Sequence, residues 1–148
     1  MQGAQVLLWL ADFAQVQGEK MTSVGAGVTV RDPEPQPMFL AGIIRLPRDV
    51  VGTTIQLRIE LHSLPDGQRM PIKTAEGSEA EALFGVLEPT GLRDPGLETP
   101  FELALGIGVP PFGLEPSRAY RWQAYLDGET QPDWNVRFRT TPPEPLAG

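Results

Sequence analysis

The stretch from Pro116 to Gly128 constrains the fold most, because it reads as a turn, an alternating strand and a second turn. Mostly large apolar side chains occupy every second position of that strand, and more polar side chains lie between them. The first set is Tyr120, Trp122, Ala124 and Leu126, and the second is Arg121, Gln123 and Tyr125. Successive strand side chains point to opposite faces, so the pattern predicts a two-faced antiparallel sheet with one buried side.

The same two-residue period recurs along the chain. It predicts strands over residues 54–62, 101–108 and 134–138, and the last of these forms a hairpin with residues 120–126. We expect Pro110-Pro111 to end the strand over 101–108. Pro65-Asp66-Gly67 predicts a turn that leads to a short partner strand around Met70 and Ile72.

Apolar runs predict further strands over residues 6–10, 21–30, 38–46 and 82–87. Val6, Leu10, Phe13 and Ala14 would also fit one face of a helix over residues 5–17, but the all-β setting favours the strand over 6–10. Gly25 and Gly27 interrupt the second of these runs, and we expect a bulge there. A short loop at Gly18-Glu19-Lys20 would join two antiparallel strands. The Tyr120 hydroxyl is placed to bond back to the turn around residues 115–117, as a tyrosine corner does.

Sixteen Gly and sixteen Pro residues break the chain into short pieces, which favours many short strands over long helices. About eight strands with turns between them predict an all-β fold, a single-domain antiparallel β-sandwich of the Ig-like or jelly-roll-like kind. The sandwich would span residues 1–139, followed by a Pro-rich C-terminal tail over 140–148. Residues 31–37 carry Pro at every second position and predict a stiff, exposed connector.

Composition excludes several classes of site. The chain of 148 residues has no Cys, so it holds no disulfide, no zinc-thiolate centre and no cysteine nucleophile. Its net charge is -7 and its twelve Lys and Arg residues are spread singly, so we expect no nucleic-acid partner. The apolar run over 6–10 is too short for a signal sequence or a membrane span. We therefore expect a cytoplasmic protein without a membrane partner.

Few residues are candidates for catalysis or metal binding. His62 lies at an outward position beside Ser63, but adjacent strand residues face opposite ways, so we expect a solvated imidazole and no catalytic pair. The acids Glu76, Glu79 and Glu81 form one local cluster, which is typical of a solvated face. Calcium would have to use the turn acids Asp66, Asp127, Glu129 and Asp133, which lack the spacing of a calcium loop. We predict no catalytic residue, no metal and no cofactor.

Surface residues point instead to binding. We predict a non-catalytic interaction or structural module that docks on another protein or on a second copy of itself. The candidate interaction residues are Trp9, Tyr125, Phe112, Pro33, Pro35, Pro37, Pro142 and Pro143. A carbohydrate-binding sandwich centred on Tyr125 or Trp9 is the first alternative, and an enzyme with a carboxylate-based site is the second.

The order of motifs over residues 5–139 resembles a family of small uncharacterised proteins found in bacteria, especially actinobacteria, and in their phages. The motifs are Val6-Leu7-Leu8, Ala11-Asp12, Gly18-Glu19-Lys20, Gly25-Ala26-Gly27, the Pro-rich connector, Leu40-Ala41-Gly42-Ile43-Ile44, Tyr120-Arg121-Trp122 and Asp127-Gly128. These are turn and core residues, so the resemblance implies a β-sandwich and assigns no catalytic residue. It also implies a phage or prophage origin, and with it a virion, decoration or host-interaction role.

Overall fold

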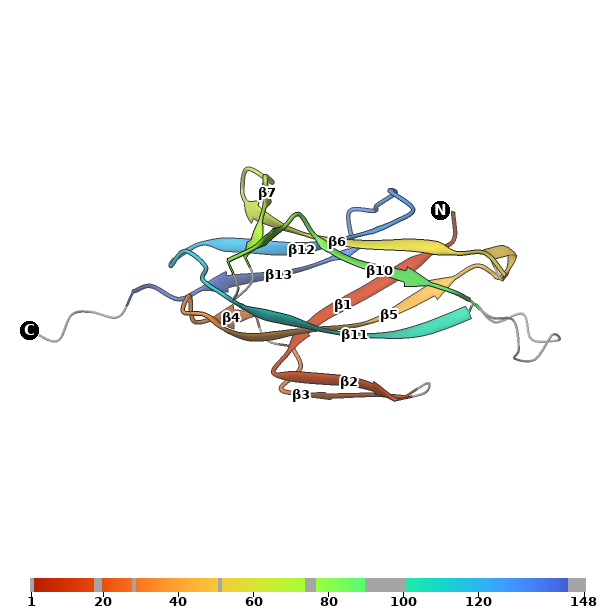
Figure 1. Cartoon of the computed structure of the whole chain (residues 1–148), viewed down its shortest axis with the longest axis horizontal. Helices are drawn as coiled ribbons and strands as arrows, with labels where there is room; N and C mark the ends of the chain where they lie inside the picture. The colour runs from red at the N-terminus through yellow and green to blue at the C-terminus, as the bar shows by residue number, and fades with distance from the viewer. Residues whose placement is uncertain are drawn as a thin grey trace, which may run out of the picture.

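The computed structural model describes residues 2–17, 20–27, 29–50, 52–73, 77–89 and 101–143 (Figure 1). These residues form thirteen strands and one 3-10 turn, η1 (Arg48–Val50). Within these ranges no helix is long and apolar enough to cross a membrane. The all-β sandwich predicted from the alternating pattern is confirmed, although the strands are more numerous because several contain only two residues.

The smaller sheet has three antiparallel strands in the order β1 (Gln5–Ala11), β5 (Gln36–Leu46) and β11 (Phe101–Phe112). The prediction that Pro110-Pro111 would end the third strand is wrong, because β11 continues to Phe112 through a register shift after Val109. Proline is tolerated there because β11 is an edge strand and an irregularity takes up the missing hydrogen bonds.

The larger sheet contains the two strands with the strictest alternation. Its order is β10 (Leu83–Leu87), β6 (Ile55–Leu64), β12 (Ala119–Leu126), β13 (Asn135–Thr140) and β4 (Val30–Arg31), with β7 (Arg69–Met70) paired beside β10 along β6. β12 and β13 form the predicted antiparallel hairpin, whereas β4 joins β13 in parallel. A further pair, β8 (Ile72–Lys73) and β9 (Glu79–Ala80), stands apart.

The core lies between the inner faces of these two sheets. Trp122 and Tyr120 are fully buried, and complete burial of an apolar side chain stabilises a fold by roughly 1.5–3 kcal/mol. The Trp122 indole N–H donates to the Met38 sulfur at 3.3 Å, which ties the larger sheet to the smaller one. The predicted tyrosine corner is confirmed, since the Glu115 amide donates to the Tyr120 hydroxyl oxygen at 3.0 Å.

A hairpin of β2 (Phe13–Gln17) and β3 (Lys20–Val24) forms a third layer on the smaller sheet. In Figure 1 it lies beyond β11, on the side away from β12. The ring centroids of Phe13 and Phe39 are 5.3 Å apart, and Gly106 leaves room for Val16 against β11. The two antiparallel strands predicted around Gly18-Glu19-Lys20 are confirmed, but Lys20 belongs to β3 and not to the loop. Gly18 and Glu19 lie outside the described residues.

The segment predicted as one bulged strand over 21–30 is instead two strands, β3 and β4. Gly25 and Gly27 have positive φ values of 66° and 87°, a conformation in which glycine is favoured, and they turn the chain from one layer to another. The connector over 31–37 is exposed at four of its seven positions, as expected, but its first residue is buried. Arg31 lies in β4, is buried, and donates to the Pro37 carbonyl oxygen at 2.7 Å.

The C-terminal strand β13 runs through Thr140, one residue into the segment predicted as a tail. The amide of Thr141 then donates to the Arg31 carbonyl oxygen. Pro142 and Pro143 follow and are exposed, and residues 144–148 lie outside the described ranges.

Candidate binding face on the larger sheet

The outer face of the larger sheet carries a group of polar side chains that includes His62 and Tyr125. Register places them in rows that cross the strands, because residues directly opposite one another share a face. One row is Arg69, His62, Arg121 and Arg137, from β7 through β6 and β12 to β13. The neighbouring rows are Glu60, Gln123 and Asn135; Phe84, Arg58 and Tyr125; and Ala119, Arg139 and Val30.

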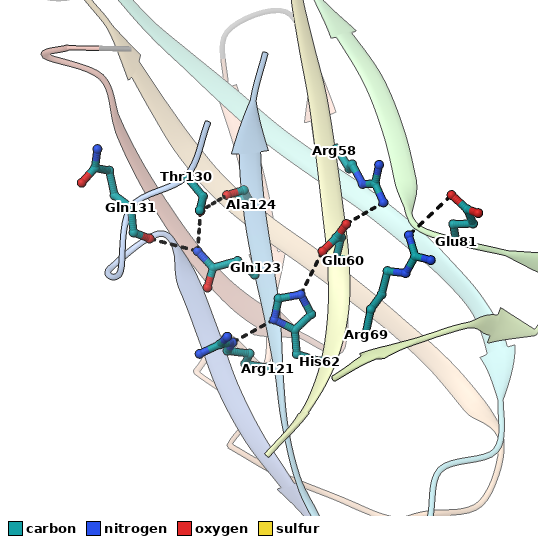
Figure 2. A network of polar contacts seen from close by, with 10 residues as sticks. All are labelled: Arg58, Glu60, His62, Arg69, Glu81, Arg121, Gln123, Ala124, Thr130 and Gln131. Atoms are coloured by element: carbon teal, nitrogen blue, oxygen red, sulfur yellow. Dashed lines mark hydrogen bonds and ion pairs between the residues drawn. The ribbon is translucent and has the colours of Figure 1, made fainter. Parts of the chain in front are cut away.

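His62 is held at the centre of this face (Figure 2). The Arg121 Nε–H donates to His62 Nδ1 at 3.0 Å, and His62 Nε2 lies 2.9 Å from Glu60 Oε1. Since an arginine can only donate, Nδ1 accepts and the ring proton is on Nε2, where it is donated to Glu60. The expectation of a solvated imidazole is wrong: the outward direction was right, but His62 is only 5% exposed because its cross-strand neighbours cover it.

Glu60 receives three donors. Arg58 Nη2 lies 2.6 Å from Glu60 Oε2, and the Tyr125 hydroxyl also bonds this carboxylate. Burial acts to raise the pKa of Glu60, but the His62 hydrogen bond and the Arg58 charge outweigh it, so the pKa is lowered overall. Burial and the adjacent Glu60 charge raise the pKa of Tyr125. The carboxylate is therefore the anchor of the network.

This network has no arrangement for nucleophilic catalysis. Ser63 is buried on the opposite side of β6, as adjacent strand positions require. Both ring nitrogens of His62 are already engaged, by Arg121 and by Glu60, so the imidazole has no free nitrogen with which to act as a general base. The contacts of His62 therefore hold the side chains of this face in place.

Arginine charge on this face is only partly compensated. Arg58 pairs with Glu60, and Arg69 lies 3.5 Å from Glu81. Arg137 and Arg139 are exposed, and neither guanidinium group has an ion-pair or hydrogen-bond partner within the described part of the chain. Arg121 stands directly opposite Arg137, although like charges at opposite positions destabilise a sheet.

A groove adjoins these arginines where β13 ends. Its volume is about 410 Å³, and its lining residues are Val30, Ser117, Arg118, Ala119, Arg139, Thr140, Thr141 and Pro142. Val30 and Ala119 flank Arg139 on the outer face, so the groove continues the same surface. Arg118 at its margin lies 3.2 Å from Glu115. The groove therefore combines apolar walls with guanidinium groups.

The far end of the face is apolar and aromatic. Phe84 and Val86, on β10, are 68% and 55% exposed. The Arg58 guanidinium lies 5.6 Å from the centre of the Phe84 ring, within the range of a cation–π contact. An apolar end and a cationic end thus lie on one sheet face.

The structure separates the residues predicted as an interaction surface. Tyr125 is half-buried on the outer face, and Pro142 lines the groove next to Pro143. Phe112 is buried in the core, edge-on to Trp122, so its ring is not on the surface as expected. The others lie elsewhere: Trp9 is half-buried on the outer side of the smaller sheet, Pro33 and Pro35 lie between β4 and β5, and Pro37 is the second residue of β5.

The candidate acids are dispersed. Glu79 lies 3.9 Å from Lys73, Glu81 pairs with Arg69, and Glu76 is outside the described residues. Asp127 Oδ1 accepts the Gln56 amide at 2.8 Å, which gives it a turn-forming role. Across the described ranges no three His, Asp or Glu side chains are grouped so that they could hold a metal ion.

Sequence reasoning did not single out Arg121, Arg137 and Arg139. A signal was present, because Arg137 and Arg139 alternate with Val136 and Phe138 and so share the outward face. The juxtaposition with Arg121 depends on the register of β12 against β13, which the sequence does not fix.

Comparison of the sequence with known protein families and with curated proteins found no match.

Proposed function

We propose that this protein is a non-catalytic β-sandwich module that docks on another protein through the outer face of its larger sheet. The observation that carries the proposal is the unpaired arginine charge there, above all Arg121 opposite Arg137. Proteins retain locally unfavourable arrangements mainly where function requires them. A partner that neutralises these guanidinium groups would remove the repulsion.

Arginine and aromatic side chains are also the residue types that dominate protein interfaces. The face offers Arg137 and Arg139 at one end and exposed Phe84 at the other. A sugar platform is supported less well, because Tyr125 is half-buried and its hydroxyl is bonded to Glu60. Arg58 lies over the Phe84 ring, the surface on which a sugar would stack.

The biological setting that we propose, a virion or host-interaction component of a phage or prophage, rests on the family resemblance described above. The docking face itself does not depend on that setting.

Affinity capture with matched variants tests the proposal. The test variant is Arg137→Glu with Arg139→Glu, and the control is Arg45→Gln, an exposed arginine that pairs with Glu102 on the outer side of the smaller sheet. We expect one or more proteins to be retained by the wild type and the control but lost from the double variant. Retention of the same proteins by all three forms, or of none, would contradict the proposal. Light scattering on each form reports whether the retained partner is a second copy of the chain.

A further inference from the structure

The geometry points to a specific partner chemistry: an extended acidic segment that lies along β13, with carboxylates at alternate positions over Arg137 and Arg139 and an apolar side chain in the adjoining groove. This inference rests on the proposed function and names the class of partner.

Spacing supports an extended segment. Arg137 and Arg139 are two residues apart on one face of β13, so their Cβ atoms are about 7 Å apart along the strand. Carboxylates at alternate residues of an extended peptide have the same spacing, about 7 Å. Each guanidinium can therefore pair with a separate carboxylate, in the planar two-bond geometry that arginine favours.

The groove supplies an anchor beyond the charges. Arg139, two residues from Arg137 on the same face of β13, also lines the groove, whose walls include Val30, Ala119 and Pro142. An apolar side chain two residues beyond the second carboxylate would face the same way and reach this space. An apolar anchor in a pocket, flanked by charge pairs, is how short segments gain both affinity and register.

Charge distribution favours a short acidic segment over nucleic acid. The whole chain carries a net charge of -7, which would repel a long polyanion, whereas a short segment meets the local arginine charge. Single-stranded nucleic acid also calls for aromatic platforms beside the basic groove, and the groove lining contains no aromatic residue.

Labelled heptapeptides test the inference by fluorescence polarisation at low salt. The probe has two Glu residues separated by one residue, with a Leu two residues beyond the second Glu. It is made in both chain directions, because β13 could accept either. Controls replace both Glu by Gln, or Leu by Ala, and an oligothymidylate is the polyanion control.

We expect the Glu peptide in one direction to bind at least about tenfold more tightly than its Gln counterpart, because the Gln peptide cannot form the charged hydrogen bonds to the two guanidinium groups. Arg137→Gln with Arg139→Gln should weaken that binding by a similar factor, and binding should weaken as salt rises. Arg45→Gln should leave it unchanged. Replacing Leu by Ala should also weaken binding.

Equal affinity for the Glu and Gln peptides, or no binding by either, would overturn the inference, as would tighter binding of the oligothymidylate. If no peptide binds while the variant Arg137→Glu with Arg139→Glu still loses its captured partner, the inference is wrong and the proposed docking face stands. If the acidic peptide binds but capture does not depend on the arginines, the docking proposal fails instead.

Discussion

Glu60 organises the outer face at the level of single residues. Its carboxylate accepts from Arg58, from His62 and from Tyr125, and its side chain is only 13% exposed. His62 in turn orients Arg121 through the 3.0 Å bond to its Nδ1 atom. The guanidinium that faces Arg137 is therefore held in place by a carboxylate two side chains away.

Replacing Glu60 by Gln should make stability less dependent on pH. The pKa of Glu60 is lowered in the folded protein, so its carboxylate stabilises the fold above the unfolded pKa of about 4.5, and this contribution is lost as the pH falls through the folded pKa. We expect Glu60→Gln to lower the free energy of unfolding by about 1–3 kcal/mol at pH 7 and by less at pH 3.5. Urea denaturation at both pH values measures the difference.

Glu102→Gln is the matched control, because Glu102 forms an exposed ion pair with Arg45. It should change stability by less than about 1 kcal/mol at either pH. A Glu60→Gln deficit that stays constant or grows on acidification would show that the carboxylate charge is not what stabilises the network.

The sequence predicted which face of the sheet a single side chain lies on, but it did not predict how deeply that side chain is buried or which hydrogen-bond partners it has. Tyr120 could be assigned to the turn because the turn is only a few residues away, and the structure confirms the bond. His62 could be placed on the outer face by parity. Its burial depends on Arg121, which lies 59 residues further along the chain, and no local pattern specifies that pairing.

At the level of strands, Gly42 allows β1 to pair closely with β5. A Cβ atom at this position would lie against the backbone carbonyl oxygen of Leu7, closer than real contacts allow. β5 is the central strand of the smaller sheet, so a shift there would also disturb its pairing with β11.

Gly42→Ala should therefore destabilise the fold by about 1–3 kcal/mol, as overpacking does. Gly85 on β10 is the matched control, because its added Cβ would meet only the Leu57 side chain, at an ordinary 3.7 Å. Gly85→Ala should leave the free energy of unfolding unchanged or raise it by at most about 1 kcal/mol. Thermal or urea denaturation compares the two, and an equal loss in both would refute the account of Gly42.

Strands with strict alternation, such as β6 and β12, could be predicted closely from the sequence. Strands with Gly or Pro could not. Pro110-Pro111 predicted a strand end, but whether Pro ends a strand or sits in an edge irregularity depends on which neighbours β11 has. Gly25 and Gly27 predicted a bulge, but their positive φ values make a turn between two layers.

For the molecule as a whole, charge is distributed unevenly. The chain carries a net charge of -7, yet Arg121, Arg137 and Arg139 gather on one sheet face. In the sequence these basic residues are spread singly. Arg121 and Arg137 become neighbours only when β12 pairs with β13. The candidate site therefore depends on the register between strands, which the sequence does not fix. The sandwich follows from the alternating pattern, which can be read from the sequence.

The free energy of unfolding of Arg137→Gln with Arg139→Gln, measured by urea denaturation, tests the central claim that these arginines serve a partner and not the fold. The account predicts a stability equal to that of the wild type or higher by up to about 1 kcal/mol, because repulsion with Arg121 is relieved. A loss of more than about 1 kcal/mol would contradict it and make these guanidinium groups part of what holds the sheets together.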